Sequence, residues 1–167
     1  MVPAMSAPNP SPGENEGRAA PLARDWVPVV GWMVLIFGGS TDAFSAAHTS
    51  RILAPLLRWL FPDLAEPAID HVVLALRKVA HLVEYAVLAG LWWRALRRPV
   101  RSDPRPWAWR PALLAVLACA LWASTDEIHQ SFTADRTASG WDVLLDTTGA
   151  GLGLLLLWRV GAWRRWW

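Results

Sequence analysis

Two carboxylates, an imidazole and a carboxamide fall within five positions of this chain: Asp126, Glu127, His129 and Gln130. They follow the segment Pro111 to Ser124, which consists almost entirely of Ala, Leu, Val and Trp. Side chains of these types bind cations, transfer protons or ligate metals. Because ionisable groups at the end of an apolar span are costly, they indicate a functional site.

A second polar group interrupts an earlier apolar segment, Ala68 to Trp93, and comprises Arg77, Lys78, His81, Glu84 and Tyr85. Lys78, His81 and Tyr85 are spaced three and four residues apart, so they share one helix face. Glu84 lies beside that face. A charged stripe directed at lipid would be unfavourable, so we expect this face to point into a helix bundle.

A third group lies in the last apolar segment, where Asp142 and Asp146 are four residues apart and therefore lie one above the other on a helix. Gly149 and Gly153 continue the same stripe. Small residues at this spacing allow a neighbouring helix to approach closely. We therefore expect this helix to pack tightly on another at the level of its two carboxylates.

Composition indicates a membrane protein. Hydrophobic residues make up 54% of the 167 and charged residues 18%, against about 25% charged in soluble domains. The 13 Trp residues suit membrane–water interfaces. A net charge of +2 without a basic run argues against nucleic-acid binding, and the single Cys119 excludes an intramolecular disulfide.

The segments predict an all-α membrane protein with about four transmembrane helices plus a short interfacial helix in the first outer loop. A span needs about 20 apolar residues, and four segments approach this length: Trp26–Phe44, Ala68–Trp93, Pro111–Gln130 and Trp141–Arg159. Residues 45–67 carry Leu at helical spacing beside Arg51 and Arg58, which is typical of a helix lying along the membrane surface. A helix packed on the bundle would show the same pattern.

The domain organisation follows from these spans. Residues 1–24 are rich in Pro, Gly, Ala, Ser and Asn without apolar periodicity, which predicts a disordered cytoplasmic tail. Residues 25–160 form the predicted transmembrane domain. Residues 161–167 form a basic and aromatic cytoplasmic end.

Positive charge is distributed unequally between the two sides that four spans define. Eleven Lys and Arg residues lie in the tail, the loop after the second span and the C-terminal end, against five on the other side. Since cytoplasmic segments carry the excess of Lys and Arg, we expect both termini in the cytoplasm. The three polar groups then meet near the outer face of the membrane.

The polar segments resemble the VanZ-like family of bacterial membrane proteins. The resemblance rests on two motifs in order, Arg77-Lys78-Val-Ala-His81-Leu-Val-Glu84-Tyr85 and Asp126-Glu127-Ile-His129-Gln130-Ser-Phe, followed by Arg136 and Asp142. It extends over Trp26 to Arg159. It implies residence in the bacterial plasma membrane and, through the family's founding member, an association with low-level resistance to teicoplanin.

Two positions depart from the family pattern. Asp135 stands where the family usually has Gly before Arg136, and Asp146 stands where it usually has Asn. The second change places an additional carboxylate within the last span, so Asp146 must be protonated or paired.

Twelve residues make up the candidate binding or polar cluster: Arg77, Lys78, His81, Glu84, Tyr85, Asp126, Glu127, His129, Gln130, Arg136, Asp142 and Asp146. One hypothesis is a binding site, in which a lipid phosphate or an anionic cell-wall precursor is held by Arg77, Lys78 and Arg136. Its sugar or amine groups would be taken by Asp126, Glu127 and Gln130. Given the association with teicoplanin, the drug itself is an alternative ligand. Membrane lipids are the other expected partners, and the arginine-rich loop after the second span should contact anionic headgroups.

A second hypothesis is an enzyme that uses acid–base or metal chemistry on a lipid-linked substrate. The chain has no His-Glu-x-x-His motif, no Gly-rich phosphate loop, no Ser elbow and no Cys nucleophile in a basic setting. We therefore assign no metal ligands, no catalytic residues and no cofactor, and whether the protein is an enzyme stays open.

A third hypothesis is a purely structural network that sets helix register. Arg77 or Lys78 would then pair with Asp126 or Asp142, and His81 with Glu84 or Asp146. Mutual pairing without an opening would favour this hypothesis, whereas exposed charges would favour binding or chemistry.

Overall fold

Helix α3 is the element on which every other helix packs. The computed structural model describes residues 12–39, 46–97, 107–130 and 139–166, with side chains for all of these except 12–22, 46–49 and 130. The described residues form helices and no strand: α1 (Pro12–Gly39), α2 (Ala46–Leu60), α3 (Glu66–Arg97), α4 (Trp109–Gln130) and α5 (Gly140–Trp163). The predicted all-α class is confirmed.

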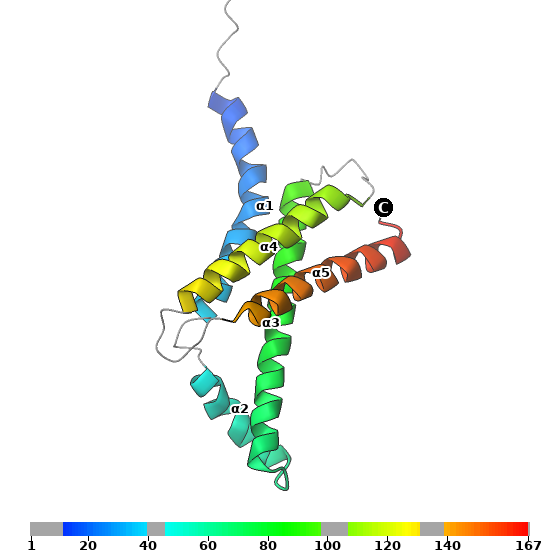
Figure 1. The fold of residues 1–167 in the computed structure, drawn as a ribbon. Coiled ribbons are helices and arrows are strands. Elements are labelled where there is room, and N and C mark those ends of the chain that lie inside the picture. Colours follow the sequence, from blue (N-terminus) through cyan, green and yellow to red (C-terminus); the bar gives the residue numbers. More distant parts are fainter. Residues whose placement is uncertain (1–11, 40–45, 98–106, 131–138, 167) are drawn as a thin grey trace, which may run out of the picture.

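The helices divide between the two halves of α3 (Figure 1). The antiparallel neighbours α4 and α5 cross its C-terminal half, and α1 packs on the same half. The N-terminal half of α3 extends beyond this body and carries α2. A small core of Ala54, Ile69 and Val73, with Leu53 and Leu57 against it, holds α2 there.

The main core is built largely from small residues. On α4 the buried positions are Ala112, Ala115, Cys119 and Ala123, which recur every three or four residues and so form one face. On α3 the buried side chains include Leu88 and Ala89. Small side chains let helices approach closely without a large apolar core, and Cys119 is one of them, a free and buried thiol.

Each predicted segment overlaps one of the helices, and the largest difference in bounds lies at the N-terminus. The structure starts α1 at Pro12, so helix covers residues 12–24 of the predicted disordered tail, and residues 1–11 lie outside the described part. Pro suits the first helical turn, and the Glu, Arg, Ala and Leu that follow favour helix. Gly13, Gly17 and Pro21 in the same stretch disfavour helix, so propensity alone does not account for this start.

Two helices meet the length and apolarity of a membrane span in the described part of the chain, fewer than the four predicted. They are Trp109–His129 of α4 and Gly140–Trp163 of α5. Only 28% and 22% of their apolar windows are buried inside the protein. Their apolar side chains therefore face outward, unlike those of a core helix in a soluble protein. In α3, charged residues including Arg77, Lys78 and Glu84 lower the apolarity.

Candidate functional site

Gly149 and Gly153 allow α5 to lie directly against α3. A Cβ atom at Gly149 would be 2.6 Å from the backbone oxygen of Leu82, and one at Gly153 would be 2.6 Å from Cα of Ala86. Any side chain at these positions would therefore push the two helices apart. The close approach predicted from the glycine stripe is confirmed, with α3 as the partner.

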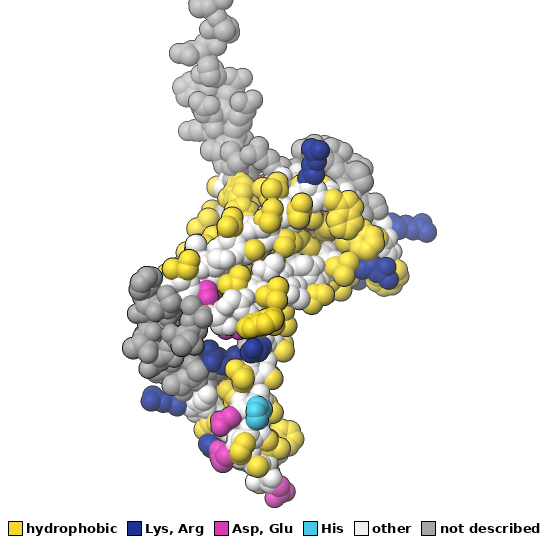
Figure 2. Space-filling model, in the orientation of Figure 1, with side chains coloured by type: hydrophobic (Ala, Val, Ile, Leu, Met, Phe, Trp, Pro, Cys, Tyr) yellow, Lys and Arg dark blue, Asp and Glu magenta, His cyan; other side chains and the backbone are white. Residues whose placement is uncertain are grey.

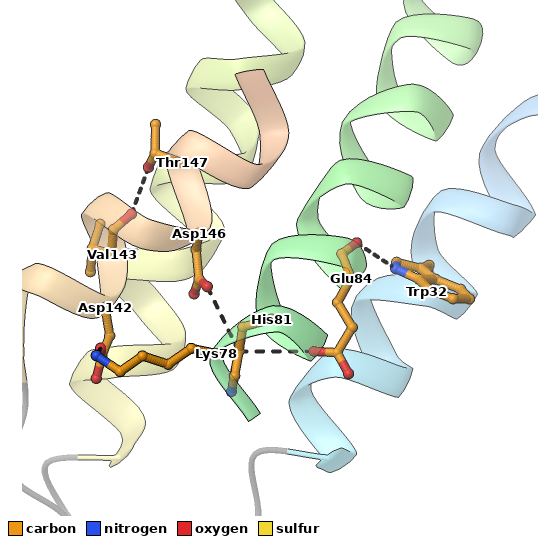
Figure 3. Close-up of polar contacts among 8 residues, drawn as sticks. All are labelled: Trp32, Lys78, His81, Glu84, Asp142, Val143, Asp146 and Thr147. Atoms are coloured by element: carbon orange, nitrogen blue, oxygen red, sulfur yellow. Dashed lines mark hydrogen bonds and ion pairs between the residues drawn. The ribbon is translucent and has the colours of Figure 1, made fainter. Parts of the chain in front are cut away.

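This contact places His81 between two carboxylates (Figure 3). Its Nδ1 atom is 3.7 Å from Oδ1 of Asp146 on α5 and 3.9 Å from Oε2 of Glu84 on its own helix. Both separations suit ion pairs with a protonated imidazole and exceed hydrogen-bonding length. The predicted pairing of His81 is confirmed with both partners, so Asp146, the departure from the family pattern, faces a cation-forming group.

A second ion pair lies at the rim of the same crossing. Nζ of Lys78 is 3.9 Å from Oδ1 of Asp142, and about half of each side chain is exposed. Asp142 also lies in the first turn of α5, where a negative charge is favoured by the helix dipole. This pair, also predicted, is a loose contact at the surface.

Helix α4 directs Asp126 into the cluster by its phase. Asp126 continues the inward face of Ala115, Cys119 and Ala123 and is only 3% exposed. Its charge acts on Glu84 and on Asp146. The third helix therefore contributes a buried carboxylate beside the His81 pair.

Asp146 lies within electrostatic range of four other carboxylates, those of Asp126, Asp142, Glu127 and Glu84. The cationic side chains of α3 are fewer. Like charges gathered at low dielectric repel strongly. The cluster is therefore suited to binding a positively charged group or protons.

Tyr85 closes the inner end of this cluster. Its side chain is fully buried, and its hydroxyl has no hydrogen-bond partner among the described residues. The charges of Asp146 and Asp126 act on it. Because a buried hydroxyl normally has a partner, this group is available to a ligand or to water.

Glu127 has a different role from its neighbour Asp126. Its Oε1 atom accepts a hydrogen bond from the backbone N–H of Ser139, the residue that precedes α5. Consecutive helical residues point about 100° apart, so Glu127 is directed toward the start of α5. It joins the end of α4 to the start of α5 and contributes its charge from there.

Helix α1 supplies contacts that sequence patterns did not indicate. The indole N–H of Trp32 donates to the backbone oxygen of Glu84 at 2.9 Å, and the ring of Phe37 lies 4.6 Å from that of His129. His129 is therefore placed against α1. In the sequence, Trp32 and Phe37 look like any aromatic residues that anchor an apolar segment at the membrane interface. No sequence pattern therefore indicates that they contact the polar cluster.

The remaining predicted residues divide by how far the structure describes them. Arg77 is half-buried on α3, in the turn before His81. The side chain of Gln130 and the whole of Arg136 lie outside the described residues. In the described part of the chain, no three His, Cys, Asp or Glu side chains are grouped as metal ligands.

The model of the VanZ/LLP1 family matches residues 26–162. The chain belongs to this family. The match covers α3, α4 and α5 completely except for the last residue of α5, and thus every residue of the polar cluster. Together with the outward apolar faces of α4 and α5, it identifies a VanZ-family membrane protein. No curated protein and no solved structure matches the chain.

Proposed function

We propose that this VanZ-family protein is a multi-pass membrane protein that binds the charged head of a lipid-linked envelope ligand at the outer face of the bacterial plasma membrane. One observation carries the proposal: His81 lies between the carboxylates of Glu84 and Asp146, while about a third of the side chains of His81 and Glu84 is exposed. The side chains of His81 and Glu84 are 30% and 34% exposed, and the cluster's ion pairs are 3.7–3.9 Å long. A network that only sets helix register would favour closed, hydrogen-bonded pairs.

The proposed topology has α1, α3, α4 and α5 crossing the membrane, with both termini in the cytoplasm. Figure 2 supports it, since apolar side chains cover the body formed by α4 and α5, and charged side chains of both signs lie over the projecting end of α3. At about 1.5 Å per residue, the 32 residues of α3 extend about 48 Å. This length exceeds a hydrocarbon core of about 30 Å, which leaves one end of α3 for polar residues.

The ligand's charges follow from those of the cluster. The acidic interior around Glu84 and Asp146 favours an amine, whereas exposed Lys78 at the rim favours a phosphate. A head group that carries both an amine and a phosphate would match the acidic interior and the Lys78 rim of the cluster. Its apolar tail would stay among the membrane lipids. Lipid-linked cell-wall precursors have this chemistry, which agrees with the family's association with glycopeptide resistance.

Direct binding tests the proposal. Purified protein in nanodiscs would be titrated with a fluorescent polyisoprenyl-diphosphate-linked muropeptide that carries a free amine. Glu84→Gln and Lys78→Gln should each weaken binding roughly tenfold, because each removes one charge-assisted contact. Asp70→Asn and Arg51→Gln are matched controls at exposed positions of α3 and α2 and should bind like wild type.

Equal affinity in all five proteins would reject the binding site and leave the structural network. The pairing of His81 with Asp146 also favours a second candidate, acid–base catalysis on the same ligand. Chromatography of the recovered ligand distinguishes the two: unchanged ligand supports binding, and a product that disappears with His81→Gln supports catalysis.

Teicoplanin resistance is the proposed cellular consequence. Expression of the wild-type chain in a susceptible Gram-positive host should raise the inhibitory concentration of teicoplanin, and Lys78→Gln should abolish the increase at equal protein level. If Lys78→Gln raises the inhibitory concentration as much as the wild type does, resistance does not depend on the polar cluster.

A further inference from the structure

An apolar groove lies between α4 and α5 at the end away from the polar cluster. It has a volume of about 610 Å³ and is lined by the first turns of α4 and the middle of α5, which is within the roughly 300–1,000 Å³ typical of ligand sites. Trp107, Val116 and Leu155 are among its walls, and Arg110 is its one charged lining residue. Water would find few hydrogen-bonding partners along such walls.

We call the end of the groove at the start of α4 its mouth, and this end carries positive charge. Arg110 is exposed and has no ion-pair partner among the described carboxylates. The ring of Trp109 lies 5.7 Å from that of Trp158, and the guanidinium of Arg159 lies over the latter. Helix α4 begins at Trp109, so the positive end of its dipole adds to these charges. An anion is favoured at this mouth, directly beside an apolar channel.

We propose that this groove binds one acyl chain of an anionic phospholipid, with the lipid phosphate on Arg110. The charge at the mouth matches the phosphate, and the apolar walls match the chain. The groove opens on helices whose apolar faces are directed outward, so a membrane lipid can enter sideways. In the topology proposed above, its mouth is at the cytoplasmic surface, where Arg residues meet anionic headgroups.

Native mass spectrometry of the whole protein tests this site. Protein released from nanodiscs with equal amounts of phosphatidylglycerol and phosphatidylcholine should retain phosphatidylglycerol preferentially. Gly151→Leu should abolish retention, because Gly151 lines the groove and a Cβ there meets no atom within 4 Å, so the new side chain extends into the channel. Arg110→Gln should remove the preference for phosphatidylglycerol.

Two controls separate these effects from a general change. Gly31→Leu adds the same side chain on α1, where a Cβ also meets nothing within 4 Å, and Arg164→Gln removes an exposed cation that does not line the groove. Both should retain phosphatidylglycerol like wild type. The proposal is overturned if wild type shows no preference, if Gly151→Leu retains the lipid, if Arg110→Gln keeps the preference, or if either control loses it.

Discussion

His81 has two acidic neighbours with different surroundings. Glu84 is about one third exposed, whereas the side chain of Asp146 is 10% exposed and lies within electrostatic range of four other carboxylates. Water can screen the first charge and much less the second. Changes at these two positions should therefore affect stability differently although both remove a partner of the same imidazole.

We expect Asp146→Asn to leave the free energy of unfolding unchanged or to raise it by about 1 kcal/mol, because removal of a carboxyl group from the field of other carboxylates relieves repulsion. The same change should weaken binding of an amine-bearing ligand. Chemical denaturation in detergent, with exposed Asp70→Asn as the control, measures the first effect. A clear loss of stability would mean that the His81–Asp146 pair outweighs the repulsion.

Tyr85→Phe separates binding from packing. The phenol ring is fully buried, and its hydroxyl has no hydrogen-bond partner among the described residues. Removal of an unpaired buried hydroxyl should not lower stability, so the melting temperature should be maintained or rise. If the hydroxyl contacts the ligand, the affinity for the ligand should fall in the same protein. Unchanged affinity would place the ligand away from Tyr85.

At the scale of elements, glycines on α5 determine how the site is assembled. Gly149→Ala should lower the free energy of unfolding by about 1–3 kcal/mol, because the new methyl group meets the backbone of Leu82. Gly151→Ala, two residues away and unobstructed, should raise stability by up to about 1 kcal/mol through helix propensity. Equal effects of the two changes, measured by thermal unfolding, would contradict the close α3–α5 contact.

The attachment of α2 to α3 should depend on pH. Arg58 makes two hydrogen bonds of 2.7 and 2.8 Å with Glu66, and these bonds lower the pKa of Glu66 below its ordinary 4.5. A carboxylate with a depressed pKa stabilises the fold above its ordinary pKa, and the effect is lost as pH falls through the folded-state value. The protection factors of the α2 amides, which are corrected for the intrinsic pH dependence of exchange, should therefore be constant between neutral pH and 5 and fall below 4. In Arg58→Gln this fall should be absent.

Sequence periodicity predicts how α4 and α5 face the cluster, but it does not predict the contribution of α1. The inward phase of Asp126 follows from the small residues at 112, 115, 119 and 123. The stripe of Asp146, Gly149 and Gly153 predicts a close helix contact, and the structure identifies α3 as the partner. The role of α1 does not follow, because its apolar segment has no polar face to show which side meets α3. Trp32 and Phe37 are therefore identified only by their contacts.

At the scale of the whole molecule, the proposed topology places the projecting end of α3 outside the cell. The only cysteine is buried, so reaction of the wild type with a membrane-impermeant maleimide should be weak. In intact cells, Asp63→Cys should react and Arg164→Cys should react only after permeabilisation. Labelling of the denatured proteins controls for intrinsic reactivity. Reaction of Arg164→Cys in intact cells would show that the C-terminus lies outside the cell and would contradict the proposed orientation.

The central claim is that the acidic cluster receives the amine of a ligand. The most direct measurement compares the affinity of the lipid-linked muropeptide with a free and with an acetylated amine, in wild type and in Glu84→Gln. Acetylation should weaken binding to wild type roughly tenfold and have little effect in Glu84→Gln, since the two changes remove one shared interaction. Equal losses in both proteins would show that the amine does not meet this cluster and would contradict the proposed function.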